Sequence, residues 1–434
     1  MKDDNDRARE GTLPKDPEEG AEEMPRPPPA PPSPSAILAS RWTPLGKLGR
    51  VLEEKPAPRT WLLRRPGEGQ GAKDEGVFPL GKAGMLAAGG GVGKTMALCQ
   101  LALGVATGRG WLEHFTTPNP GRVLLALGEE DDEEVHRRMF AAAGAIKALT
   151  PEELAAAYDR IVALPLAGVP VALVETDERG NVQPTAFLEA LRAKLRDDAG
   201  EGWRLVVLDP LSRFAGLDAE TDNAAATRFV QAVETLLDVP GRPSIIVAHH
   251  TTKDSRKGAD DTAASMIVSG STSGELATAA RGSSAIGDGF RWVATMSRAG
   301  DDAAVLAVTK SNYAPHGRPL ALTRLRDASG ALREMNDAEL EEFRKTHGGA
   351  DPQMADEDMP ERVLETLGST GGRPLSPAEL LTRLGVKSAT TANRANLGRV
   401  LDELAREKRV TFKGEKVTIA TASTTPGKPR IEER

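Results

Sequence analysis

A glycine-rich turn between an apolar strand and an apolar helix constrains the fold of this chain more than any other feature. The stretch AGMLAAGGGVGKTMALCQLALGVATG, residues 83–108, has the pattern of a strand, a turn and a helix. Its turn, from Ala88 to Thr95, fits G-x-x-x-x-G-K-[ST] except that alanine stands at the first position. A strand that ends in such a turn and continues as a helix belongs to an α/β unit.

Three further apolar runs predict the sheet to which this strand belongs. They occupy residues 122–127, 204–209 and 243–250, and stretches with helical spacing lie between them. Short, almost unbroken apolar runs are typical of parallel strands that helices cover on both faces. The alternation of strands and helices therefore predicts a doubly wound α/β domain with a mostly parallel central sheet.

The chain has 434 residues, more than one ordinary domain holds, and its composition changes along its length. Proline and acidic residues dominate the start, and the end of the chain has three helical patterns followed by VTFKGEKVTIA, which predicts a hairpin with a Gly-Glu turn. We predict a disordered leader (1–41), the α/β domain (42–336), a linker (337–357), a winged-helix-like domain (358–420) and a disordered tail (421–434).

Charge and cysteine content narrow the class of protein. The net charge of -7 argues against a uniformly basic surface, although a local basic groove is compatible with it. The single cysteine, Cys99, cannot form an internal disulfide, and its apolar helical neighbours predict a packed core thiol. No apolar run reaches the roughly 18 residues that span a bilayer. We therefore expect a protein of the reducing cytoplasm that has no membrane partner.

The residues of the turn predict phosphate binding. Its glycines let backbone N–H groups surround phosphate oxygens, Lys94 reaches the terminal phosphates, and the Thr95 hydroxyl binds Mg²⁺ at the positive end of the helix. The expected ligands are therefore ATP and Mg²⁺. The predicted nucleotide-binding residues are Gly89, Gly90, Gly91, Val92, Gly93, Lys94, Thr95 and Met96.

Acidic residues follow two of the predicted strands. Asp209 ends the apolar run RLVVLD, where its carboxylate would face the phosphates and help hold Mg²⁺. Glu129 and Glu130 follow RVLLAL, and one of them could activate the attacking water. We favour Glu129 and keep Glu130 as the alternative, whereas the acids that follow them open a helix.

Two adjacent histidines, His249 and His250, end the last of these strands. Neighbouring side chains on a strand point to opposite faces, so the pair cannot chelate one metal ion. We expect one histidine to face the nucleotide and the other to pack in the core.

Taken together and in this order, these segments resemble the RepA-like branch of the RecA/DnaB-type ATPases, which are hexameric replicative helicases of plasmids and phages. The resemblance covers about residues 50–335. Besides the glycine turn, it rests on GEEDDEEVHRRM, LVVLDPLSRFAGLDAETDN, IIVAHHTTK, RGSSAIGDGFRWVATM and VTKSNYAPHG. The chain departs from the family in Ala88, in its proline-rich leader and in the winged-helix-like domain.

The resemblance implies roles for individual residues. Glu129 matches the family's catalytic base, and His250 or His249 matches its γ-phosphate sensor. Arg291 in DGFRW falls where the family places an arginine finger that acts on the ATP of the neighbouring subunit, and Lys310 and Arg281 are weaker candidates for a role in trans.

DNA contacts are expected at two places. The loop of residues 254–280 occupies the position of a DNA-binding loop in RecA-like proteins, and Lys253, Arg256 and Lys257 could contact the phosphates of a single strand. In the winged-helix-like domain, Arg394 and Arg399 lie on the predicted third helix, which enters a major groove in helix-turn-helix proteins. Winged helices also bind proteins, so a replication partner is the alternative.

These observations predict a RecA-like P-loop ATPase that assembles as a hexameric ring and moves along single-stranded or forked DNA during replication of a plasmid, phage or integrated element. The alternative is a DNA-binding ATPase that acts as a switch or loader without unwinding. In both cases hydrolysis uses Lys94, Glu129 and Asp209 of one protomer and Arg291 of its neighbour.

Overall fold

The computed structural model describes residues 33–67, 72–216, 222–251, 284–300, 302–325, 330–348, 358–386, 391–414 and 416–420. The chain divides into two compact units, Met1–Pro58 and Arg59–Arg434. In the first unit, α1 (Pro34–Arg41) is followed by the 3₁₀ helix η1 (Leu45–Leu48). Helix α1 lies within the segment that we predict as a disordered leader, and it begins there because Ser33 accepts a hydrogen bond from the Ala36 amide and proline opens the first turn.

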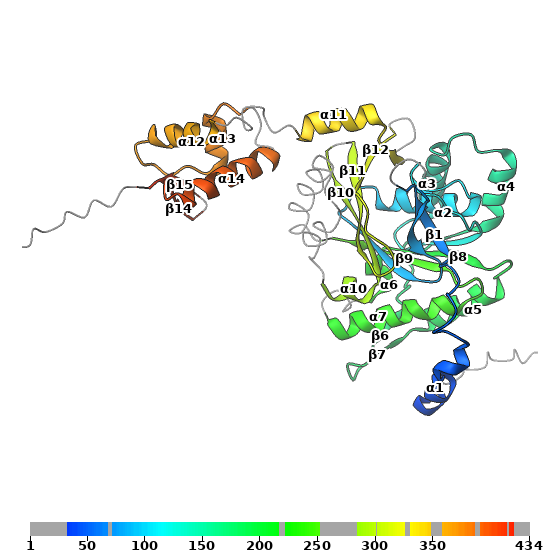
Figure 1. Ribbon diagram of the computed structural model, residues 1–434. Helices are drawn as coiled ribbons and strands as arrows, with labels where there is room; N and C mark the ends of the chain where they lie inside the picture. The colour runs from blue at the N-terminus through cyan, green and yellow to red at the C-terminus, as the bar shows by residue number, and fades with distance from the viewer. Residues whose placement is uncertain are drawn as a thin grey trace, which may run out of the picture. The chain divides into compact units, whose positions relative to one another are not determined.

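A nine-stranded sheet in the order β13-β12-β11-β10-β3-β9-β8-β4-β5 forms the core of the large domain, residues 59–348 of the second unit. Figure 1 labels strands β8 to β12 of this sheet. The strands from β10 to β5 in this order all run parallel, and β11, β12 and β13 continue the sheet with antiparallel pairs. The strands are β3 (Ala83–Ala88), β4 (Arg122–Leu127), β5 (Ile161–Pro165), β8 (Trp203–Asp209), β9 (Ser244–His250), β10 (Trp292–Arg298), β11 (Ala303–Ser311), β12 (Leu320–Arg324) and β13 (Leu332–Glu334).

Helices cover both faces of this sheet, which explains the unbroken apolar runs. Along β4, Val123 and Leu125 join the core beneath one set of helices, whereas Leu124 and Ala126 join the core beneath the other set. The first core contains side chains of α2 (Lys94–Thr107), α3 (Asp132–Gly144) and α4 (Pro151–Arg160). The second contains side chains of α5 (Ala186–Asp197), α6 (Leu211–Phe214), α7 (Asn223–Thr235), η2 (Leu236–Asp238) and α10 (Ser284–Gly289). The mostly parallel α/β fold is as predicted, and Cys99 lies buried in the first core.

Two short hairpins and one further helix complete the large domain. Strands β1 (Trp61–Arg65) and β2 (Glu75–Pro79) pair with each other, as do β6 (Val174–Thr176) and β7 (Val182–Pro184). Helix α11 (Asp337–Gly348) occupies much of the segment that we predict as a linker. Acidic residues in its first turn favour this helix, although its apolar spacing is poor. Among the described helices, none has the length and hydropathy to cross a membrane.

The C-terminal residues form a small core of their own. Helices α12 (Met359–Gly368), α13 (Pro377–Arg383) and α14 (Thr391–Arg406) precede the hairpin of β14 (Val410–Lys413) and β15 (Lys416–Ile419). Leu375, between the first two helices, forms an isolated antiparallel bridge with Val417 of β15. Apolar side chains of all three helices and of both strands make up the core. Three helices followed by a hairpin is the order of elements that the sequence predicts.

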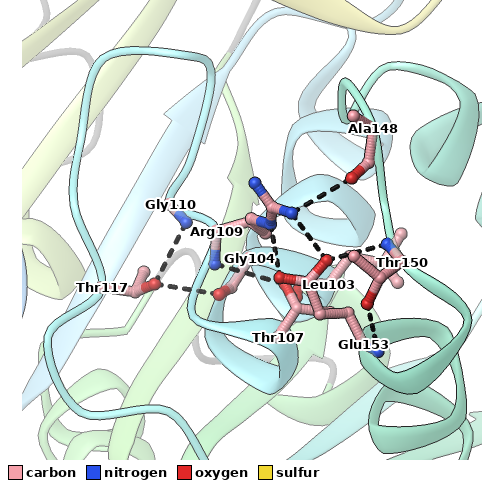
Figure 2. A network of polar contacts seen from close by, with 9 residues as sticks. All are labelled: Leu103, Gly104, Thr107, Arg109, Gly110, Thr117, Ala148, Thr150 and Glu153. Atoms are coloured by element: carbon pink, nitrogen blue, oxygen red, sulfur yellow. Dashed lines mark hydrogen bonds and ion pairs between the residues drawn. The ribbon is translucent and has the colours of Figure 1, made fainter.

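A polar network joins the end of α2 to the start of α4 (Figure 2). The Arg109 guanidinium donates hydrogen bonds to both carboxylate oxygens of Glu153, at 2.6 and 2.7 Å, and to the Ala148 carbonyl at 3.0 Å. Glu153 also accepts the Thr150 amide, and Thr150 caps the helix in return. The Arg109 hydrogen bond is the main reason that the pKa of Glu153 is lowered from 4.5 to about 2.

A buried glutamine of α2 is hydrogen-bonded to β13, the outermost strand of the sheet. The side-chain amide of Gln100 donates to the Leu332 carbonyl at 2.7 Å and accepts the Leu332 amide at 2.9 Å. Gln100 is almost fully buried, and Leu332 opens β13. Both backbone groups of Leu332 are therefore satisfied by one side chain of the helix that follows the glycine turn.

We predict that Gln100→Leu destabilises the protein by about 2–4 kcal/mol, because it leaves the buried amide and carbonyl of Leu332 without their partner. Urea unfolding followed by circular dichroism measures this difference. The matched control is Gln231→Leu on the exposed surface of α7, which should change stability by less than about 0.5 kcal/mol. Equal effects of the two substitutions would contradict a structural role for Gln100.

The ion pair between Arg109 and Glu153 should make stability depend on pH in acid. The pKa of Glu153 in the folded protein lies below its ordinary value of 4.5, so the pair stabilises the fold above about pH 4.5 and this contribution is lost as the pH falls toward 2. We expect wild type to be more stable than Arg109→Gln at pH 7 and the difference to shrink below pH 4.5. Urea midpoints at stepped pH measure it, and a constant difference down to pH 3 would contradict the assignment.

Candidate nucleotide-binding site

The glycine turn leaves the end of β3 and forms the start of α2. Gly91 and Gly93 have φ angles of 75° and 106°, in the left-handed region that side chains disfavour. Gly93 is the N-cap of α2, and a Cβ atom there would lie 3.2 Å from Leu332 and 3.3 Å from Arg324. The φ angle therefore favours glycine at this position, and a larger residue would also push the ends of the Leu332 and Arg324 side chains away by a few tenths of an ångström.

Asp209 meets two residues of the turn at the carboxyl edge of the sheet. The Lys94 ammonium forms an ion pair with Oδ1 of Asp209, and Thr95 donates its hydroxyl hydrogen to Oδ2 at 2.7 Å. Lys94 and Asp209 are each only 4% exposed. The structure thus brings together the lysine, the hydroxyl and the carboxylate that the sequence analysis assigns to phosphate and Mg²⁺.

The oxygen pair of Thr95 and Asp209 fits a magnesium ion. Mg²⁺ binds oxygen atoms at about 2.0–2.1 Å in an octahedron, so neighbouring ligand oxygens lie about 2.9 Å apart. The 2.7 Å between Thr95 Oγ1 and Asp209 Oδ2 is close to that edge length. Hydroxyl and carboxylate oxygens are also the hard ligands that Mg²⁺ prefers.

Glu129 and Glu130 lie beside this cluster but in different surroundings. The amide of Gly128 donates to the Asp209 carbonyl at 2.7 Å, which joins the ends of β4 and β8. Glu129 is 45% exposed and lies 3.4 Å from the Arg213 guanidinium. Glu130 is 16% exposed and pairs with Arg138 of α3 at 2.9 Å.

Burial makes Glu130 a weaker acid than an ordinary glutamate. Desolvation raises the pKa of Glu130, the charge of Arg138 opposes this rise, and the carboxylates of Glu134 and Asp209 add to it. Glu130 is therefore within electrostatic range of Asp209, whereas Glu129 has the more open access to water.

The two histidines at the end of β9 face different surroundings, as their alternation predicts. His249 pairs in register with Ala87 and is 4% exposed, whereas His250 pairs with Ala88 and is exposed. Burial lowers the pKa of His249 to about 4, with further contributions from the positive charges of Lys94 and His250. His249 is therefore neutral at pH 7, and its ring lies near the Lys94 ammonium.

Two candidates for a role in trans, Arg291 and Lys310, lie at the end of the sheet opposite the glycine turn. Arg291 precedes β10, which runs parallel to β3 with Met296 beside Ala88, so Arg291 is about 16 Å back along the strand from the start of the turn. Lys310 lies next to it, and its ammonium donates to the carbonyls of Gly287 and Asp288 at 3.1 and 2.9 Å. Desolvation lowers the pKa of Lys310, and the charge of Arg291 contributes.

The remaining predicted residues concern DNA or the trans site. Lys253, Arg256, Lys257 and Arg281 lie outside the described residues. Arg394 and Arg399 are exposed on α14, and Arg399 donates to the side chain of Asn396. The structure thus puts both arginines on the surface of the third C-terminal helix.

Sequence reasoning missed two arginines that reach the turn from within the same chain. Arg298 is the last residue of β10 and Arg324 is the last residue of β12, and both donate hydrogen bonds to the Gly91 carbonyl, at 3.3 and 2.8 Å. For Arg298 a signal was present, because it ends an apolar run as Asp209 does. The approach of Arg324 to the turn could be recognised only once the order and direction of the strands were known.

Comparison with known proteins finds a family model that matches part of the chain. Residues 49–256 match the family model described as "AAA domain". This range contains the glycine turn, both glutamates, Asp209 and the two histidines. Arg291, Lys310 and the C-terminal helices lie beyond it.

Solved structures resemble the chain only in part. One, described as an ATPase domain, has 13% identity and a TM-score of 0.39, over 59% of this chain and 85% of that chain. "The Structure Of A DnaB-Like Replicative Helicase And Its Interactions With Primase" has 12% identity and a TM-score of 0.40, over 59% of each chain. "Crystal structure of the RadB recombinase" has 14% identity and a TM-score of 0.36, over 60% of this chain and 94% of that chain.

Proposed function

We propose that this chain, whose residues 49–256 match the AAA domain family, is an ATP- and Mg²⁺-dependent motor of the RepA type that acts on DNA as a hexameric ring. The observation that carries the ATPase proposal is the buried cluster of Lys94, Thr95 and Asp209 at the mouth of the glycine turn. A buried ion pair contributes little to the stability of a fold, so we infer that this one is present to bind a ligand.

The residues of the cluster have separate tasks in the proposed hydrolysis. The glycine turn and Lys94 bind the phosphates, and Thr95 and Asp209 hold Mg²⁺, which neutralises charge on the terminal phosphates when bound. Glu129 orients and deprotonates the attacking water, because it is the more exposed of the two glutamates and contacts Arg213 only at 3.4 Å. Glu130, held by Arg138, is the alternative base.

The location of Arg291 supports a site shared between protomers. It lies just before the amino end of β10, whereas its own glycine turn lies at the carboxyl end of β3. It can therefore serve a nucleotide only if that nucleotide belongs to another protomer. A contact of this head-to-tail kind produces a ring when the rotation closes. Lys310 beside it and Arg281 are further residues for the same interface, and His250 or His249 would report the γ-phosphate to the DNA-binding loops.

The proposed DNA contacts are of two kinds. Lys253, Arg256 and Lys257 would bind the phosphates of a single strand inside the ring, and Arg394 and Arg399 would bind DNA or a replication partner through the C-terminal domain. The exposure of both arginines on α14 supports this second contact. It also favours one rival function, in which the C-terminal domain directs the ATPase to its site and the ring acts as a switch or loader. We place the protein in the cytoplasm, in the replication of a plasmid, phage or integrated element.

Mixing two inactive variants tests the shared site. Glu129→Gln should bind ATP and barely hydrolyse it, and Arg291→Ala should fold and assemble but lose about 10³-fold or more in turnover. In mixed rings, a site with the glutamate of one variant and the arginine of the other is complete. Random mixing at equal amounts should therefore restore up to about one quarter of wild-type ATPase activity. Mixtures that stay as inactive as their components would contradict the assignment of Arg291.

A forked DNA substrate separates the motor from the switch. We expect single-stranded DNA to stimulate ATP hydrolysis and the protein to displace the paired strand of a fork, because translocation couples the two activities. The measurement is ATPase rate with and without DNA, together with strand displacement followed by fluorescence. ATP hydrolysis and DNA binding without displacement would favour the switch or loader over the motor.

A further inference from the structure

Two guanidinium groups converge on the rim of the glycine turn from the same chain. Arg324 donates to the Gly91 carbonyl oxygen at 2.8 Å, and Arg298 donates to the same oxygen at 3.3 Å. A Cβ atom at Gly91 would lie 3.4 Å from the Arg298 guanidinium, and one at Gly93 would lie 3.3 Å from that of Arg324. Both cations therefore lie directly against the turn.

The direction of the strands explains this convergence. Strand β10 is parallel to β3, and β12 runs the same way as β10 because each is antiparallel to β11. The carboxyl ends of β3, β10 and β12 thus lie at one edge of the sheet. Arg298 and Arg324, as the last residues of their strands, extend from that edge toward the turn.

Arg324 is also held in place from the opposite side. It pairs in register with Leu332 of β13, and the backbone of Leu332 is bound by Gln100 of α2. Its own amide donates to the Asp302 carbonyl at 2.9 Å. The helix that begins at Lys94 therefore fixes the strand that carries Arg324, so the guanidinium keeps a defined position relative to the phosphate-binding residues.

The arrangement concentrates positive charge where a polyphosphate would lie. Burial lowers the pKa of Arg324, the positive charge of Arg298 lowers it further, and Asp302 opposes the shift. Two like charges beside each other repel, and an anion between them removes this repulsion. Gly91 precedes Lys94 by three residues, so the two guanidinium groups stand on the rim of the cradle whose lysine reaches the terminal phosphates.

We propose that Arg298 and Arg324 bind the terminal phosphate of the nucleotide in cis and make the site prefer a triphosphate over a diphosphate. Guanidinium groups bind phosphate through paired hydrogen bonds, and the γ-phosphate supplies acceptor oxygens and charge that a diphosphate lacks. This inference rests on the proposed nucleotide site. It differs from the role of Arg291, because the pair acts on bound nucleotide within one protomer and needs no neighbour.

Equilibrium binding of two nucleotides tests the proposal. The probes are fluorescent ADP and a fluorescent, non-hydrolysable ATP analogue, each with Mg²⁺ and the full-length protein. Arg298→Ala and Arg324→Ala should each weaken binding of the ATP analogue about tenfold and change ADP binding less than about twofold, because the lost contacts go to the γ-phosphate. Arg298→Lys and Arg324→Lys keep the charge and should lose less. Arg196→Ala, an exposed arginine on α5, is the matched control and should bind both nucleotides like wild type.

The outcomes separate this inference from the proposed function. Equal weakening of both nucleotides would mean that the arginines only hold the turn in place, and unchanged affinity for both would mean that they have no role; either result overturns the proposal. Lys94→Ala tests the nucleotide site itself, and wild-type binding by that variant would refute the proposed function. If an alanine variant does not fold, the lysine variant decides: a preference for the ATP analogue unchanged from wild type in both lysine variants overturns the proposal.

Discussion

The parallel alignment of β3, β9, β8 and β4 is the constraint on which the rest of the site depends. Because the strands run the same way, their carboxyl ends meet at one edge and bring Lys94, Asp209 and the histidine and glutamate pairs together from distant parts of the chain. Burying Lys94 and Asp209 removes two charges from water, which their mutual attraction repays only in part. Removing either partner would leave the other charge buried and uncompensated, so a substitution at either residue should destabilise the fold.

The two glutamates show how packing distinguishes neighbours that are alike in sequence. Glu129 and Glu130 follow the same strand, but the turn after β4, which is hydrogen-bonded to the end of β8, directs one toward Arg213 and solvent and the other toward Arg138 and Asp209. A general base has to accept a proton from a water molecule, so access matters as much as acidity. Glu130, whose charge is already balanced by Arg138, is better suited to hold α3 against the edge of the sheet.

Local patterns in the sequence predicted the buried strands of the sheet, because their apolar composition does not depend on distant parts of the chain. The apolar runs gave β3 and β4 with the expected bounds and β8 and β9 to within one residue, because strands buried on both faces contain few polar residues. Arg324 could not be predicted in this way. It lies 230 residues after Lys94, and its approach to the turn depends on two antiparallel reversals and on Gln100, none of which leaves a periodic signal. Helix α11 was missed because its apolar spacing is poor, although its acidic first turn and the reciprocal cap of Asn336 and Glu339 are local signals for a helix start.

The positions of the arginines suggest a division of labour between binding and turnover. In our proposals, Arg298 and Arg324 act on the protomer's own nucleotide, and Arg291, at the opposite edge of the sheet, acts on the nucleotide of a neighbour. A cation of the same protomer can contribute to ground-state affinity before assembly, whereas a cation of the neighbour can stabilise charge in the transition state only after assembly. Each protomer would then bind a triphosphate by itself but hydrolyse it only next to another protomer. The nucleotide state of each protomer would then be coupled to the geometry of the ring. A motor that moves along DNA needs this coupling, because hydrolysis by isolated protomers would produce no movement.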